Sequence, residues 1–60
     1  MSPELSRRVG AAMHAVDATF EEHVAGVNVL ARVETEAELP GWLARLLIRG
    51  ERKLSARGGP

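Results

Sequence analysis

The first part of this 60-residue sequence contains three side chains whose types and spacing could form a chemical site: His14, Asp17 and Glu21. If the residues around them form one helix, steps of three and four positions bring an imidazole and two carboxylates onto one face. Divalent cations accept both kinds of ligand, so the three residues are a candidate metal site. The Glu-x-x-His pair of carboxylate-bridged iron bundles does not accompany them. We therefore expect no cofactor and keep a metal- or small-ligand-binding subunit as an alternative.

A run of cations near the C-terminus is the second such group. It consists of Arg45, Arg49, Arg52, Lys53 and Arg57. Guanidinium forks suit phosphate oxygens, so Arg45, Arg49, Arg52 and Lys53 are candidate phosphate contacts of a DNA-binding regulator or antitoxin. The residues between them are mostly aliphatic, whereas helices that read bases carry polar residues there. A solvated helix face is the other interpretation of the same stripe.

No arrangement of residues predicts catalysis. The serines have no histidine–carboxylate grouping at a suggestive spacing, and neither a phosphate-binding glycine loop nor a metalloprotease motif is present. A chain of this length also has little room for a pocket of its own. We therefore expect a non-enzymatic protein.

Length and composition limit how the chain can be stabilised. Sixty residues form one small domain, residues 1–60, and such a domain buries only about 60% of the surface that its unfolded chain exposes. Cysteine is absent, which excludes disulfides and thiolate metal sites, so oligomerisation is the expected source of further stability. No apolar run approaches the ~18 residues of a membrane span, and Met1-Ser2-Pro3-Glu4 lacks the layout of a signal peptide. We expect a cytoplasmic protein without a membrane partner.

The net charge of zero hides two oppositely charged halves. Residues 1–40 carry three arginines against seven carboxylates, and residues 41–60 carry five cations against Glu51. Such asymmetry indicates either that the two halves fold onto each other or that the basic part meets an acidic partner.

An apolar seam at helical spacing is the strongest structural signal. It comprises Leu5, Val9, Met13, Val16, Phe20, Val24, Val27 and Ala31. Steps of three and four residues place all of them on one stripe of a single helix. Ser2-Pro3-Glu4 is a good helix start, because serine caps free N–H groups and proline suits the first position. The sequence therefore predicts a long helix over about residues 3–33.

Residues 27–34 also fit a strand. Valine and alanine alternate there with other residues at a period of two, which is typical of a strand, and a lone strand would need a partner from another subunit. The alternative fold is thus α-β-α with an intersubunit strand at 27–34. Leu30 separates the two, because a continuous helix buries it and a strand places it opposite the valines.

A second helix is predicted over about residues 40–55. Pro40-Gly41 is typical of a connection that leads into a first helical turn, and residues 56–60 are predicted to form a frayed tail. The apolar stripe of this helix consists of Leu39, Leu43, Leu46, Leu47 and Leu54. The expected fold is therefore all-α, a two-helix hairpin.

The seam is longer than one short helix can cover, so we expect the hairpin to dimerise into a helical bundle. Opposite the seam, the first helix carries a face of small residues that a partner could also cover. The interface candidates are Val9, Met13, Val16, Phe20, His23, Val24 and Val27 on the seam and Ala11, Ala18 and Ala25 on the small face. The expected function is an interaction module, such as an accessory subunit, adaptor or regulator, which binds itself and another protein. Nucleic acid is the alternative partner.

Overall fold

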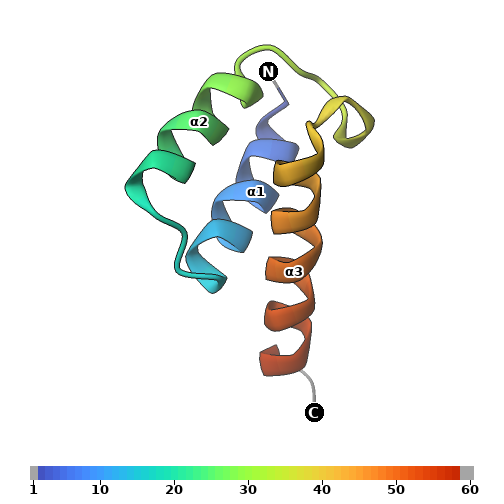
Figure 1. The fold of residues 1–60 in the computed structure, drawn as a ribbon. Helices are drawn as coiled ribbons and strands as arrows, with labels where there is room; N and C mark the ends of the chain where they lie inside the picture. Colours follow the sequence, from blue (N-terminus) through green and yellow to red (C-terminus); the bar gives the residue numbers. More distant parts are fainter. Residues whose placement is uncertain (1, 59–60) are drawn as a thin grey trace.

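The first helix begins at Ser2, as the sequence predicts. In the computed structural model, which describes residues 2–58, the Oγ of Ser2 accepts a hydrogen bond from the backbone N–H of Leu5 (3.2 Å). Pro3 lies in the first turn, where its missing N–H leaves no bond unmade, and Glu4 complements the positive end of the helix dipole. Helix α1 spans Pro3–Ala15 (Figure 1).

The prediction of one long helix over residues 3–33 is wrong, because the chain turns at residues 16–19. Asp17 has a φ of 56°, the left-handed conformation in which many helices end. The N–H of Asp17 donates to the carbonyl of His14 (3.2 Å), and the N–H of Ala18 donates to that of Met13 (2.9 Å). These two bonds form a Schellman motif, with an aspartate where glycine is usual, and they satisfy carbonyls that the helix end leaves free.

Thr19 then starts a separate helix, α2, which spans Phe20–Leu30. The Oγ1 of Thr19 accepts from the N–H of Glu22 (3.1 Å), and the N–H of Thr19 donates to the Glu22 carboxylate (2.8 Å). This reciprocal capping box gives hydrogen-bond acceptors to the backbone N–H groups of Thr19 and Glu22, and it fixes the first turn of α2. The predicted two-helix hairpin is thus corrected to a fold of three α-helices.

The alternative strand at residues 27–34 is also wrong. Residues 27–30 form the last turn of α2, and no strand occurs among residues 2–58. Leu30 is only 7% exposed and belongs to the core, as the helical alternative predicts. The chain is all-α within its described part, and the class predicted from the sequence is confirmed.

A connection of ten residues leads from α2 to the last helix and contains a short 3-10 helix, η1, at Glu36–Glu38. Helix α3 follows Pro40 and spans Gly41–Gly58, close to the predicted residues 40–55. Residues 56–58 of the expected tail belong to α3, and residues 59 and 60 lie outside the described part of the chain. None of the helices within residues 2–58 is both long and apolar enough to cross a membrane.

The core lies mainly between α1 and α3, and α2 packs on α1 more lightly (Figure 1). Each of α1 and α3 contributes an apolar stripe, and the connection adds two side chains. The buried residues of this apolar cluster are Leu5, Val9, Ala12 and Met13 of α1, Leu30 of α2, Val33 and Leu39 of the connection, and Leu43, Leu46 and Leu47 of α3. From α2, only Gly26 and Leu30 are buried.

At Gly50, α3 crosses α1 so closely that there is no room for a side chain. A Cβ added to Gly50 would lie 2.5 Å from the Cα and 2.6 Å from the carbonyl oxygen of Ala12. The neighbour is backbone, which cannot swing away. Only a residue without a side chain therefore allows this helix crossing.

We expect Gly50→Ala to lower the free energy of unfolding by about 1–3 kcal/mol, because its methyl group would force the two backbones apart. Gly10→Ala is the matched control, since a Cβ at Gly10 meets nothing within 4 Å. That change should instead raise stability by about 1 kcal/mol through helix propensity. Denaturant unfolding at one chain concentration measures both. Equal stabilisation by the two substitutions would contradict the close crossing.

The left-handed residue in the turn gives a second test. Asp17→Gly and Asp17→Ala remove the same charge, but only alanine keeps a Cβ in the left-handed region. The glycine variant should therefore be more stable than the alanine variant by about 1 kcal/mol. Thermal melts of the two variants side by side measure the difference. If alanine were as stable as glycine, the turn would not hold residue 17 in this conformation.

Candidate functional site

The outward face of α2 is the most conspicuous apolar surface of the molecule. Phe20, Val24 and Val27 are 82%, 45% and 65% exposed, although they lie at positions i, i+4 and i+7 of one helix. We call these three residues the α2 stripe. Contiguous exposed apolar side chains of this kind mark interaction sites more often than scattered ones do.

A groove of about 250 Å³ runs beside this stripe, between α1 and α2. Its lining residues are Ser6, Gly10, Met13, His23, Val27 and Leu30. The lining is mostly apolar because Gly10 has no side chain and Met13 and Leu30 belong to the core. The Oγ of Ser6 is buried and has no hydrogen-bond partner among residues 2–58. We call this feature the α1–α2 groove.

The interface residues predicted from the seam are divided by the turn at residues 16–19. Val9 and Met13 are buried inside the single chain, and Val16 and Ala18 are half-buried against its core. Phe20, Val24 and Val27 remain on the surface, because the second half of the seam now belongs to α2. Of the small face, Ala11 and Ala25 are exposed.

His23 is exposed in the single chain rather than buried on the seam. Its Nδ1 lies 2.9 Å from the carbonyl oxygen of Thr19, one turn earlier in α2. The ring lines the α1–α2 groove and also borders the α2 stripe. His23 would therefore become buried only if a partner covered this surface.

The candidate metal ligands are not brought together. His14 belongs to α1, Asp17 to the turn and Glu21 to α2, so the single helix face that would align them does not exist. Among residues 2–58, no group of three His, Cys, Asp or Glu side chains could hold a metal ion. The physical reason is the break between the two helices.

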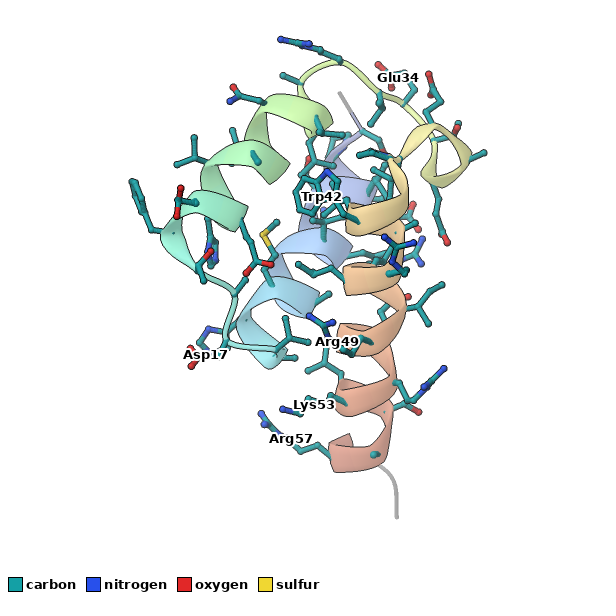
Figure 2. All side chains as sticks on the ribbon, in the orientation of Figure 1. Asp17, Glu34, Trp42, Arg49, Lys53 and Arg57 are labelled. Carbon is teal, nitrogen blue, oxygen red and sulfur yellow. The ribbon has the colours of Figure 1, made fainter. Side chains whose placement is uncertain are left out.

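The predicted phosphate contacts all lie exposed on α3, which has Arg45, Arg49, Arg52 and Lys53 on its surface. Figure 2 shows Arg49, Lys53 and Arg57 projecting from the same side of the lower half of this helix. A hollow of about 460 Å³ lies there, and Val16 at the end of α1 forms part of its lining.

Arg8 forms a polar link that sequence reasoning missed. Its Nε and Nη2 donate to the two carboxylate oxygens of Glu51 (2.8 and 2.9 Å), and its Nη1 lies 2.9 Å from a carboxylate oxygen of Glu36. The hydrogen bonds from Arg8 hold the pKa of Glu51 below its ordinary value. The link joins α1 to α3 and η1, and no local sequence signal connects residues 43 positions apart.

Glu38 organises the connection in a similar way. One of its carboxylate oxygens accepts hydrogen bonds from the N–H groups of Glu34 and Thr35 (2.9 and 3.0 Å) and from the Thr35 hydroxyl (3.2 Å). The two backbone bonds are the main reason why the pKa of Glu38 is lowered. The spacing of Thr35 and Glu38 is that of a capping box, so this contact had a signal in the sequence.

In comparisons with known proteins, no family model matches this chain, and no curated protein or solved structure matches it either. The surfaces described above are therefore the basis for proposing a function.

The Arg8–Glu51 pair predicts a pH dependence of stability. Because the folded pKa of Glu51 is lowered, its contribution is present above the ordinary carboxyl pKa and is lost as pH falls through the folded value. Wild-type stability should thus decline as pH falls below the ordinary carboxyl pKa of about 4.3, and not between neutral pH and that value. Glu51→Gln should flatten part of that decline in denaturant unfolding. Arg8→Gln, and the double variant, should show the same flattening as Glu51→Gln; additive effects would mean that the two residues act separately.

Proposed function

We propose that this protein is a small, non-enzymatic helical interaction module that associates with a second copy of itself through α2. The observation that carries the proposal is the exposure of the α2 stripe: the turn at residues 16–19 leaves half of the apolar seam outside the core of the chain. A 60-residue domain with a single small core commonly gains stability by association.

A second copy fits this surface because it carries both a projecting aromatic ring and a groove, toward opposite ends of α2. Phe20 projects from the start of α2, and the α1–α2 groove opens near Val27 and Leu30 at the other end of the helix. In a two-fold dimer the same surface of both copies forms the interface, so the Phe20 ring of each copy can enter the α1–α2 groove of the other. Aromatic side chains that fill a pocket are the usual anchors of such interfaces.

The charges beside the stripe favour antiparallel α2 helices. Glu21 and Asn28 lie along one edge of the stripe, seven residues apart on α2, and Arg32 follows the end of this helix by two residues. In an antiparallel pair related by a two-fold axis, the same edges of both helices meet. Glu21 of one copy then lies near Arg32 of the other, at both ends of the contact, and the helix dipoles oppose each other favourably.

The role that follows is that of an accessory subunit, adaptor or regulator that acts as a dimer. The exposed parts of α1 and α3 stay accessible for another protein in this arrangement. No observation within the described residues favours the alternative of a metal-binding subunit.

Mass measurement by light scattering across a range of concentrations tests the proposal. The wild-type protein should show twice its chain mass of 6.5 kDa. Phe20→Asp should raise the dissociation constant at least about thirtyfold, as expected for an aromatic anchor worth about 2 kcal/mol. Its fold should persist, because Phe20 makes little contact within the single chain.

Ile48→Asp is the matched control, since Ile48 is 53% exposed but lies on α3, away from the stripe. It should leave the dimer intact. Glu21→Arg should weaken association, and adding Arg32→Glu should restore it if the helices are antiparallel. A wild-type mass of one chain at every concentration, or dissociation by Ile48→Asp but not by Phe20→Asp, would overturn the proposal.

A further inference from the structure

Helix α3 extends beyond the body of the molecule. It has 18 residues against 13 in α1, which corresponds to about 27 Å against about 20 Å. Figure 1 shows its C-terminal half passing the end of α1 and the turn into α2. Residues 52–57 are all exposed, so this half of the helix is covered by no other element of the described chain.

This projecting helix carries positive charge without compensation. We define the basic face as Arg45, Arg49, Arg52, Lys53 and Arg57, and none of these five has an ion-pair partner within residues 2–58. Glu51 is the one carboxylate in the sequence of α3, and Arg8 engages both of its oxygens. Arg8 therefore neutralises the one carboxylate of this helix, and the five cations of the basic face stay exposed to solvent.

The basic face borders a shaped hollow. Arg49, Arg52 and Lys53 line it on one side, and the methyl groups of Val16 and Ala56 complete it. Asp17, in the α1–α2 turn, forms no ion pair with Arg49, Lys53 or Arg57. Three cations with free donors thus converge on one concave surface, where an anion would meet several of them together.

We propose that the basic face binds the phosphate backbone of a nucleic acid. Its cations extend from Arg45 to Arg57, a rise of about 18 Å along the helix, so they form a row rather than a single anion site. Duplex DNA carries one negative charge per ~1.7 Å of its axis, and such a row meets several phosphates at once. Arginine, which makes up four of the five residues, donates to phosphate oxygens in pairs.

Binding through this face is independent of base sequence. The side chains between the cations are aliphatic residues, glycine and serine, apart from the paired Glu51, and they offer few groups that distinguish one base pair from another. An anionic membrane is the less suitable polyanion, because the projecting half of α3 carries a single large apolar side chain, Leu54, to enter a bilayer.

Fluorescence anisotropy with a labelled duplex of arbitrary sequence, across salt concentrations from about 50 to 200 mM, tests the inference. The logarithm of the association constant should fall with the logarithm of salt concentration with a slope of about −4.5 if all five cations meet phosphates. Arg49→Gln should make the slope less negative by about 0.9 and weaken binding about eightfold at about 0.1 M salt. Arg49→Gln/Lys53→Gln should double the change in slope.

Arg7→Gln is the matched control, because Arg7 is an exposed arginine on α1 outside the basic face. It should leave both affinity and slope unchanged. Phe20→Asp keeps the basic face intact. In a Phe20→Asp background, Arg49→Gln should change the salt slope per chain by the same amount as it does in the wild type, whether or not the chain dimerises. A second duplex of different sequence should bind with equal affinity.

Three results would overturn the inference. The first is an absence of duplex binding at the lowest salt concentration, and the second is an equal loss of affinity in Arg7→Gln. The third is displacement of the duplex by inorganic phosphate beyond what chloride achieves at matched ionic strength, and vesicles of phosphatidylglycerol serve as the parallel lipid probe. Vesicle binding without duplex binding would assign the face to a lipid surface, and phosphate displacement would assign it to a single small anion.

Discussion

The crossing of α1 and α3 at Ala12 and Gly50 is the constraint on which the other contacts depend. The absence of a side chain at Gly50 lets the two backbones meet, and this sets the spacing at which Val9 and Leu43 become fully buried. The same spacing places Arg8 opposite Glu51, at hydrogen-bond distance in two places. A wider crossing would separate the polar pair and open gaps in the apolar layer, so close packing and the ionic link support each other.

The turn at residues 16–19 determines which apolar side chains are inside. Before it, the seam belongs to α1 and is covered by α3 within the chain. After it, the seam belongs to α2, which turns Gly26 and Leu30 toward α1 and leaves the α2 stripe in solvent. One stretch of sequence with a uniform apolar period therefore provides both the core and the surface proposed for association.

The sequence was sufficient to predict the helical class, the start at Ser2, the second long helix and the helical state of Leu30. These follow from local rules: capping groups, proline position and period. The break after Ala15 was not predicted, because the apolar period continues across it in phase and an aspartate, not a glycine, occupies the left-handed position. Thr19 and Glu22 have the spacing of a capping box, a signal of a new helix start that the prediction of one long helix did not use.

The surfaces were predictable only in part. Phe20, Val24 and Val27 were named as interface residues, but their exposure in the single chain depends on where α1 ends. The cations of α3 were also named, whereas their freedom from carboxylates depends on Arg8, 43 residues away from Glu51. A contact of that range has no period or spacing to reveal it, and it emerges only when the tertiary fold is known.

Because the principal packing partners are the first and last helices, the chain has almost no core that neighbouring segments can build alone. Bringing Ala12 to Gly50 closes a loop that contains α2 and the whole connection. The chain loses conformational entropy in this closure before burial of the α3 leucines can stabilise the fold. During synthesis, which proceeds from the N-terminus, α1 and α2 emerge with their apolar faces uncovered. Folding of this domain on the ribosome thus waits for the last third of its sequence.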